Sequence, residues 1–350
     1  MPTVSVIIPT HNRARLLVEA IQSVLDQTYA DFEVLVVDDG STDDTADVVR
    51  GMGDSRIRYL YQEHGERSAA RNRGLAEAQG AYIAFLDDDD LYLPHHLEGS
   101  VDFLEAHPDV ALVCGGTQLM DVEGIVQIAA RPWVNQPEPT LLNCAMGRCY
   151  LHPCSVLFRR QILECMDHWF DPTFHLAEDY DFFFRMALVG RFAWLPEVVA
   201  SYRVIHTDRS PSLYLEARQA AHRMLDKLFA RPDLPEEVRA ARLQVYLQMR
   251  FFNACSAYLC GSPTWGKREL LHALLLDPAL GEETARLFVE SVSKAAPVRW
   301  SVHDPHAYVD YVFDHLPRPL ASFDRYRHEV HETVRARGDS ELAPTDGQTG

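Results

Sequence analysis

The chain has 350 residues, of which 47% are hydrophobic and 24% charged, an ordinary balance for a globular protein with one large or two smaller domains. Its net charge of −18 argues against nucleic acid as a partner and against broad attraction to anionic lipid. No apolar run reaches the length of a transmembrane helix, so we expect a cytoplasmic protein, with peripheral association at the inner face of the membrane left open.

Seven cysteines are present, and no pair of them has the close spacing of a zinc knuckle. The chain begins directly with a strand pattern and without a recognisable signal peptide. We therefore expect the cysteines to be reduced thiols of a cytosolic protein.

Strand and helix patterns alternate along the first third of the chain. Short apolar runs rich in β-branched residues predict strands, and apolar residues at helical spacing predict the helices between them. The predicted strands are residues 4–8, 32–37, 57–61, 81–86 and 110–114. This alternation predicts an α/β fold with a doubly wound, mostly parallel sheet and right-handed crossovers.

The pattern weakens after residue 121. Residues 121–143 predict a hairpin and a loop over the substrate, punctuated by Pro132, Pro137 and Pro139. Further along, the predicted elements are a strand at 155–158, a short helix at 160–166, a helix from 177 to about 189, strands at 192–195 and 198–202, and a polar loop at 203–210.

Helical patterns dominate after Pro211. They cover residues 213–230, 236–260, 267–275 and 282–295. We therefore expect a catalytic domain at 1–210, a helical region at 211–336, and a disordered polar tail at 337–350.

Four consecutive carboxylates, Asp87 to Asp90, follow the buried strand at 81–86. In an open α/β sheet, ligands bind just beyond the carboxyl ends of the strands. Adjacent aspartates repel one another at neutral pH, and a bound divalent cation would remove much of that cost. Oxygen-rich sites suit Mg²⁺ or Mn²⁺, which proteins commonly share with substrate phosphates. The alternative is a solvated acidic loop that caps the next helix.

Two further acidic sites stand where a strand ends or a helix begins, at Asp38-Asp39 and at Glu178-Asp179. Three arginines, Arg67, Arg71 and Arg73, lie between these sites in the sequence. Carboxylates, a metal and arginines together suit a nucleoside diphosphate, although Arg71 and Arg73 could also form a solvated helix face. Glu178-Asp179 could equally be a helix cap that interacts favourably with the helix dipole.

Several motifs occur together in one order and spacing: Val4 to Arg13, Val37 to Asp43, Ala70-Arg71-Asn72-Arg73-Gly74 and Phe85 to Asp90. Together they resemble the family 2 glycosyltransferases, which are inverting enzymes with the glycosyltransferase A fold. Ala177-Glu178-Asp179 and Tyr202 to His206 are similar to downstream motifs of that family. The resemblance covers about residues 3–210.

The resemblance implies roles for individual residues. Asp39 is similar to the aspartate that contacts the uracil of UDP-sugars, and Asp179 resembles the catalytic base. Asp87 and Asp89 correspond to the Asp-any-Asp metal motif, with Asp89 as the direct ligand, and His206 resembles a residue near the metal or diphosphate. The remaining nucleotide-site residues implied are Pro9, Thr10, His11, Asn12, Arg67, Arg71 and Asp88.

The chemistry implied is a single displacement. An acceptor hydroxyl attacks the anomeric carbon of a nucleotide-diphosphate sugar, preferably a UDP-sugar, while a carboxylate takes its proton. One base without a nucleophile gives inversion, and Mn²⁺ or Mg²⁺ assists the leaving diphosphate. The expected acceptor is a hydroxyl-bearing glycan, lipid-linked glycan or small molecule.

Two other classes of protein share parts of this sequence pattern. A dinucleotide-dependent oxidoreductase would need a glycine-rich turn after the first strand, and the chain has Pro9 to Arg13 there instead. A catalytically silent scaffold that binds sugar nucleotides or partner proteins stays open, although the complete acidic set argues against it.

Overall fold

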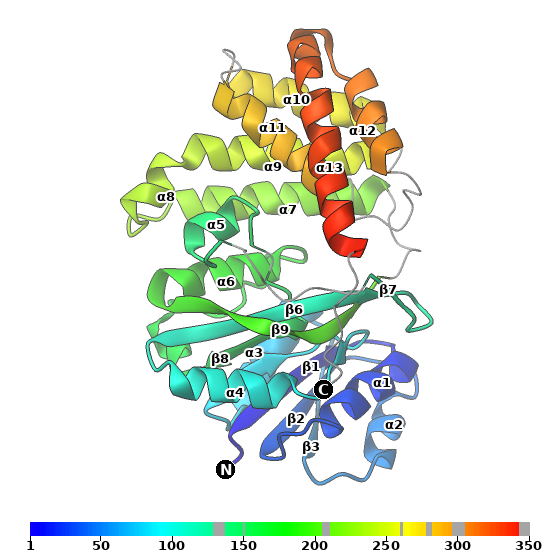
Figure 1. Ribbon diagram of the computed structural model, residues 1–350. Helices are drawn as coiled ribbons and strands as arrows, with labels where there is room; N and C mark the ends of the chain where they lie inside the picture. Colours follow the sequence, from blue (N-terminus) through cyan, green and yellow to red (C-terminus); the bar gives the residue numbers. More distant parts are fainter. Residues whose placement is uncertain are drawn as a thin grey trace, which may run out of the picture. The chain divides into compact units, whose positions relative to one another are not determined.

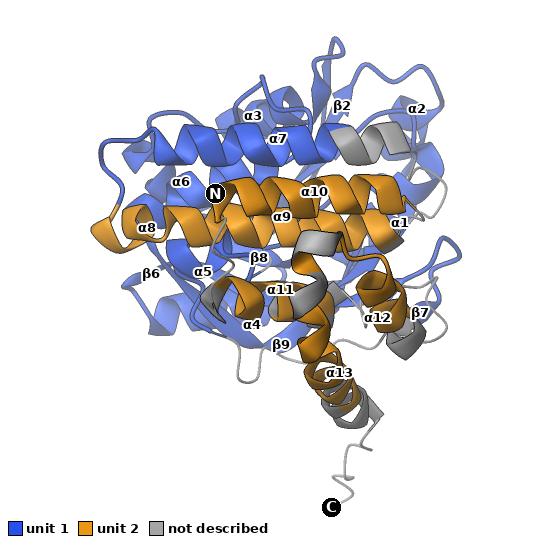
Figure 2. Ribbon diagram, turned by 90° about the horizontal axis from the view of Figure 1, so that it is seen from above, with its two compact units in different colours: residues 1–208, 215–234 blue, residues 209–214, 235–350 orange. Residues whose placement is uncertain are grey.

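The computed structural model describes residues 1–128, 137–149, 151–204, 211–259, 262–277, 282–295 and 305–342. The chain divides into two compact units, which Figure 2 shows in blue and orange. Unit 1 comprises residues 1–208 and 215–234, and unit 2 comprises residues 209–214 and 235–350. The division differs from the expected boundary at 210, because residues 215–234 pack with the unit that contains the sheet.

Unit 1 contains a nine-stranded mixed sheet in the order β3-β2-β1-β4-β8-β6-β9-β5, with β7 paired to β6 (Figure 1). Strands β3, β2, β1 and β4 are parallel, whereas β8 runs antiparallel to both of its neighbours. The parallel order therefore holds for the N-terminal part of the sheet and gives way to mixed pairing beyond β4. The strands are β1 (Val4–Thr10), β2 (Phe32–Asp39), β3 (Ile57–Gln62), β4 (Tyr82–Phe85), β5 (Leu91–Tyr92), β6 (Val110–Met120), β7 (Val126–Ile128), β8 (Val156–Arg159) and β9 (Arg191–Arg203).

Helices connect these strands, as the alternating pattern predicts, and the doubly wound α/β class is confirmed. The helices of this part of the chain are α1 (Ala14–Leu25), α2 (Thr45–Gly51), α3 (Glu66–Glu77), α4 (His96–Ala106), α5 (Leu141–Ala145), α6 (Glu178–Val189) and α7 (Pro211–Phe229). Residues 153–155 and 160–165 form 3₁₀ turns, the second where a short helix was expected.

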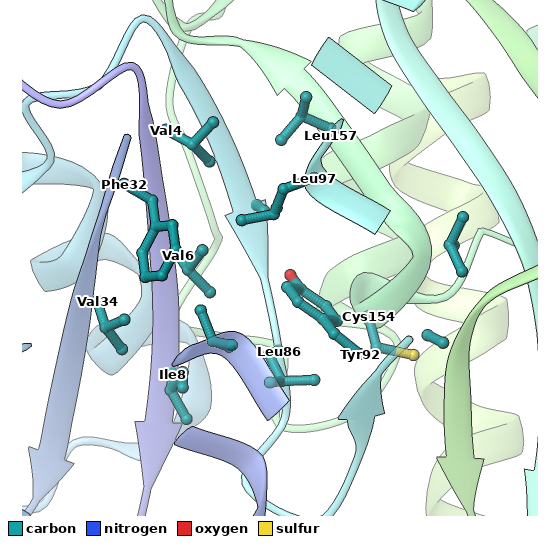
Figure 3. Close-up of a cluster of buried hydrophobic side chains, with 14 of the residues drawn as sticks. Val4, Val6, Ile8, Phe32, Val34, Leu86, Tyr92, Leu97, Cys154 and Leu157 are labelled. Carbon is teal, nitrogen blue, oxygen red and sulfur yellow. The ribbon is translucent and has the colours of Figure 1, made fainter. Parts of the chain in front are cut away.

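The core of unit 1 forms because β1 and β2 are apolar on both faces. Every residue of these two strands is buried, which fits strands covered by helices on both sides. Figure 3 shows one side of this core, where Val6 and Ile8 of β1 lie with Val34 of β2 and with Leu97 of α4. Hydrophobic packing thereby fixes the edge at which these strands end.

Unit 2 is helical. Phe288 of α11 (Glu282–Ala295) contacts Phe251 of α9 at 5.5 Å and Phe323 at 5.3 Å between ring centroids. Buried aromatic pairs of this kind supply much of the packing energy of a helical unit. The other elements are α8 (Glu236–Ala240), α9 (Arg242–Leu259), α10 (Pro263–Leu276), α12 (Pro305–Asp314), a 3₁₀ segment (Arg318–Tyr326) and α13 (Arg327–Leu342).

The largest differences from the predicted boundaries are in the later part of the chain. The strands expected at 192–195 and 198–202 are one continuous strand, β9, and β6 is longer than expected. The helix expected at 236–260 breaks at residue 241, and α13 continues to Leu342, into the segment expected to be a tail. Of the hairpin expected at 121–143, the β6–β7 pair is present, and residues 129–136 lie outside the described part of the chain. No helix in the described ranges is both long and apolar enough for a membrane crossing.

Candidate active site

The carboxyl ends of β1, β2 and β4 meet at one edge of the sheet. Thr10 of β1 pairs in register with Asp38 of β2, and the β4 strand leads directly into Asp87. The side-chain hydroxyl of Thr10 donates to Asp88 at 2.8 Å, which joins the end of β1 to the acidic loop. The first two acidic sites of the sequence therefore share this edge, as the parallel order predicts.

Asp39 ends β2 and is only 3% exposed. Its Oδ1 accepts hydrogen bonds from the side-chain amide of Gln62 at 2.6 Å and from the backbone N–H of Gly65 at 2.9 Å. Its Oδ2 lies 2.8 Å from Nδ1 of His64. The carboxylate is thus held rigidly by the segment after β3, and its position is set before any ligand binds.

The turn after β1 places His11 and Asn12 beside Asp39. Nδ1 of His11 lies 2.8 Å from the backbone oxygen of Asp39, and its ring stacks on His64 with centroids 4.5 Å apart. Asn12 adopts φ +54° and accepts a hydrogen bond from the backbone N–H of Thr42 at 2.7 Å. The stacked imidazoles and Asp39 together form a polar, flat-sided corner that suits a planar base. Pro9 lies within β1 and is buried.

The acidic loop that follows β4 is partly compensated by Arg13. Nη1 of Arg13 lies 3.1 Å from Oδ1 of Asp88 and 2.7 Å from Oδ2 of Asp89. Burial raises the pKa of Asp88 to about 6, with Asp89 adding to the rise and Arg13 opposing it. Burial and the charge of Asp87 likewise raise the pKa of Asp89. Negative charge in this loop therefore exceeds what one arginine neutralises.

Arg71 of α3 connects the acidic loop to α6. Its side chain is 1% exposed, and its two terminal nitrogens donate to Asp87 at 2.7 Å and to Glu178 at 2.8 Å. Burial disfavours ionisation of Asp87. The charges of Arg71 and, to a smaller extent, Arg67 outweigh this effect and hold the pKa of the Asp87 carboxyl below its usual value. Arg67 is more exposed and lies 3.9 Å from Glu178. Arg67 and Arg71 therefore lie beside acidic residues of the predicted site, whereas Arg73 is half exposed and pairs with Glu77 at 3.2 Å instead.

Asp179 stands at the start of α6, next to this ion pair. Ala177, the residue before α6, has φ +62°, a left-handed conformation that redirects the chain into the helix. Oδ1 of Asp179 accepts the backbone N–H of Tyr180 at 2.8 Å. Burial raises the pKa of Asp179 to about 7; the Glu178 carboxylate adds to the rise and Arg71 opposes it. A carboxylate with this pKa is suited to accept a proton near neutral pH.

Arg203 contributes to the site, although the sequence pattern assigned it no role. Arg203 ends β9 with a buried side chain that donates to the backbone oxygen of Asp89 at 2.7 Å and to Glu19 of α1 at 2.7 Å. Its backbone N–H donates to Asp90 at 2.8 Å, so Arg203 holds the last two residues of the acidic loop in place. Both Arg13 and Arg203 lie within motifs that resemble those of the family 2 glycosyltransferases, and that position was the available signal for them. His206 lies outside the described residues.

The residues of the acidic loop fit a divalent cation. The side chains of the loop offer carboxylate oxygens, which suit Mg²⁺ and Mn²⁺. Burial, together with the neighbouring carboxylates, raises the pKa of Asp88 and Asp89, so a cation bound there would favour their ionised forms. A second group with ligand-like spacing, His168, Asp171 and Asp181, lies away from this loop in sequence. The ammonium of Lys227 already lies among these three side chains.

The fold is of the glycosyltransferase A type. Residues 5–167, just under half of the chain, match the model described as glycosyl transferase family 2. A glycosyltransferase of Rickettsia prowazekii is 32% identical over 212 residues, 58% of this chain and 64% of the relative. The glucosyltransferase WfgD of Escherichia coli, which uses UDP-Glc and an α-D-GlcNAc-diphosphoundecaprenol acceptor, is 35% identical over 163 residues, 44% of this chain and 64% of WfgD.

The chain spans less than two thirds of these relatives, and only 28% of a Rickettsia bellii glycosyltransferase that it matches with 35% identity over 196 residues. Solved structures confirm the fold over more of the chain. TarS of S. aureus superposes with a TM-score of 0.56 and 22% identity, covering 97% of this chain and 55% of TarS. The mannosyltransferase PcManGT from Pyrobaculum calidifontis, in complex with GDP-Man and Mn²⁺, gives a TM-score of 0.58 and 20% identity, covering 95% of this chain and 87% of that chain.

Proposed function

We propose that this protein is an inverting, metal-dependent glycosyltransferase that moves a sugar from a UDP-sugar to an acceptor hydroxyl. The observation that carries the proposal is the Arg71 bridge. One buried guanidinium contacts both Asp87 of the acidic loop and Glu178, the residue before the candidate base Asp179. A donor site and a proton acceptor are therefore held at a fixed separation.

The donor site has two parts. Asp39, with the stacked His11 and His64, receives the base, and Pro9, Thr10 and Asn12 support this side of the nucleotide pocket. The diphosphate would lie toward the acidic loop, where Asp87 and Asp89 would hold a divalent cation, Asp88 supports the loop, and Arg67 and Arg71 supply positive charge. Such a cation would supply charge neutralisation for the leaving diphosphate.

Asp179 acts as the base. It accepts the proton of the acceptor hydroxyl as that oxygen attacks the anomeric carbon, and the nucleoside diphosphate leaves from the opposite face. One carboxylate in this role, with no second one placed as nucleophile, gives inversion of the anomeric centre. A pKa of about 7 leaves Asp179 largely ionised slightly above neutral pH while it keeps enough basicity to take the proton.

The acceptor is a hydroxyl-bearing glycan, lipid-linked glycan or small molecule. WfgD acts on a lipid-diphosphate-linked sugar and uses UDP-Glc. TarS 1–349, at a TM-score of 0.56 and 20% identity, was solved with UDP-GlcNAc. UDP-Glc and UDP-GlcNAc therefore lead the donor panel, and GDP-mannose enters it because PcManGT binds that nucleotide.

The test uses the full chain and the donor panel, with Mn²⁺, with Mg²⁺ and with excess chelator. Isothermal titration measures nucleotide binding, and release of nucleoside diphosphate measures donor hydrolysis and transfer. We expect metal-dependent UDP binding and UDP release that increases with a hydroxyl acceptor, with product of inverted anomeric configuration by NMR. Tight nucleotide binding without hydrolysis or transfer would favour a catalytically silent scaffold that binds sugar nucleotides. Full activity in excess chelator would show that the reaction needs no divalent metal.

A further inference from the structure

The far end of α7 carries a cation that lies among three acceptors of unit 1. Nζ of Lys227 lies 2.6 Å from Oδ2 of Asp171, 3.0 Å from Oδ1 of Asp181 and 3.2 Å from Nε2 of His168. Asp181 belongs to the first turn of α6, two residues after Asp179. This lysine therefore joins α7 both to the candidate base helix and to the segment that precedes it.

Asp181 depends on its cationic partners because its side chain is 4% exposed. Arg185, one turn further along α6 and equally buried, provides the second charge at 2.8 Å. The same guanidinium donates to the backbone oxygens of His168 and Trp169. Removing one partner from a buried ion-pair network leaves charge uncompensated, which costs more than losing a surface pair.

The segment 167–174 is held on its other side by α3. Asn72 exchanges two hydrogen bonds with the backbone of Phe170, at 2.8 and 2.9 Å. The hydroxyl of Ser68 donates to the backbone oxygen of Phe174 at 3.1 Å. Phe170 also stacks on Phe182 of α6, with ring planes 7° apart and centroids separated by 4.2 Å. Polar anchors from α3 and α7 thus bracket an aromatic contact with α6.

The geometry points to Lys227 as a positioning residue: by anchoring residues 167–174 and the first turn of α6, it holds the Asp179 carboxylate where the acceptor hydroxyl is deprotonated. This inference rests on the proposed function. The family model ends at residue 167, and the catalytic domain was expected to end at residue 210. The inference places Lys227 in the catalytic unit as well, which then reaches residue 234, the end of unit 1. Lys227 contacts the helix of the base and acts through Asp181.

The test compares Lys227→Met with Lys227→Arg and Arg223→Met. Methionine keeps the apolar stem and removes the charge, and arginine restores the charge. Arg223 is the control, because it is an exposed cation one turn earlier on α7 and none of the contacts described joins it to residues 167–181. Displacement of a reacting group by about 1 Å can cost about 100-fold in rate.

We therefore expect Lys227→Met to lower kcat about 10- to 100-fold with UDP affinity within about twofold of wild type. Lys227→Arg should recover most of the loss, and Arg223→Met should match wild type. Normal kcat in Lys227→Met, or an equal loss of UDP affinity, would overturn the inference. If Lys227→Met does not fold, Asp171→Asn replaces it, because this change removes one of the acceptors of Lys227. We expect Asp171→Asn to lower kcat by a smaller factor and to leave UDP affinity unchanged. An unchanged kcat in Asp171→Asn would overturn the inference.

Hydrogen exchange separates this inference from the proposed function, because it needs no substrate. Amides of residues 178–182 should exchange faster in Lys227→Met than in wild type or Arg223→Met. Unchanged exchange there would contradict an anchoring role. A wild-type chain that shows neither transfer nor hydrolysis, together with faster exchange in Lys227→Met, would remove the proposed function and leave the anchoring intact.

Discussion

Arg71 and Glu178 are 107 positions apart in the sequence, yet Nη1 of Arg71 donates to Oε1 of Glu178 at 2.8 Å inside unit 1. Both side chains are almost fully buried, and the second nitrogen of Arg71 donates to Asp87. Burying three charged groups is costly unless they are paired, and here each carboxylate has a share of the same cation. The pairing joins the acidic loop to the helix of the candidate base.

Arg71→Met should destabilise the protein and abolish transfer. The change leaves Asp87 and Glu178 without their shared cation, and breaking a buried pair from one side costs about 3–5 kcal/mol. Chemical denaturation and the Tm measure this loss. Arg73→Met on the same helix is the control, because Arg73 is half exposed and pairs with Glu77 at 3.2 Å. A surface change of that kind stays within about 0.5 kcal/mol. Equal stability of the two variants would contradict the bridge.

Asp179→Asn should lower turnover by about 10²–10⁴-fold, the usual value of a general base. The amide keeps the shape and removes the basicity, so UDP affinity should stay close to wild type. Near-normal turnover would move the base to Glu178 or Asp181. A parallel loss of UDP affinity would place Asp179 in the donor site instead. Side-by-side kinetics and titration calorimetry distinguish these outcomes.

The pH dependence of turnover gives an independent test of the same carboxyl. Burial, with Glu178 adding to it, raises the pKa of Asp179 to about 7. Below that pH the carboxyl is protonated and accepts no proton, so kcat should fall about tenfold per pH unit as the pH drops from 7. A raised folded-state pKa also means that Asp179 favours folding most at low pH and loses that contribution as the pH rises through 7. Asp179→Asn should therefore gain stability relative to wild type at pH 8, but not at pH 4.

Arg13→Met tests the acidic loop as a cation site. Arg13 compensates Asp88 and Asp89 when no metal is bound, so its loss leaves more uncompensated negative charge there. We expect a lower Tm in chelator and a larger increase in Tm on adding Mn²⁺ than in wild type. Arg15→Met, an exposed position in the first turn of α1, is the control. In Asp89→Ala the Mn²⁺-dependent increase should disappear and UDP should bind more weakly. An identical Mn²⁺ response in all four proteins would exclude a metal at this loop.

The described part of unit 2 contains helices and no strand, and therefore no acidic loop at a strand end, and we propose for it a role in packing, acceptor docking or oligomerisation. A chain that ends after residue 234 should bind UDP and hydrolyse donor, whereas one that ends after residue 210 lacks Lys227 and should lose turnover. Transfer to the natural acceptor at the normal rate by the 234-residue chain would exclude acceptor docking. Size-exclusion chromatography tests oligomerisation.

The sequence by itself determines the local features of the site. Asp39 and Asp87 could be placed at strand ends because each follows a short apolar run bounded by polar residues, a pattern set by neighbours in the chain. Parallel order then brought both to one edge without any knowledge of side-chain contacts. The resemblance to the family 2 glycosyltransferases followed from four motifs whose order and spacing are properties of the sequence alone.

Tertiary structure decided which charges meet. Arg13 could have been a solvated residue at the start of α1, yet it compensates two aspartates 75 and 76 positions away. Lys227 stood in a segment assigned to a separate helical region, and it proved to pack on α6 of unit 1. Such pairings join segments whose separation in space depends on strand order and helix packing, and a local pattern carries no information about either. The strand ends were therefore predictable, and the ion pairs that fix Asp179 and the acidic loop were not.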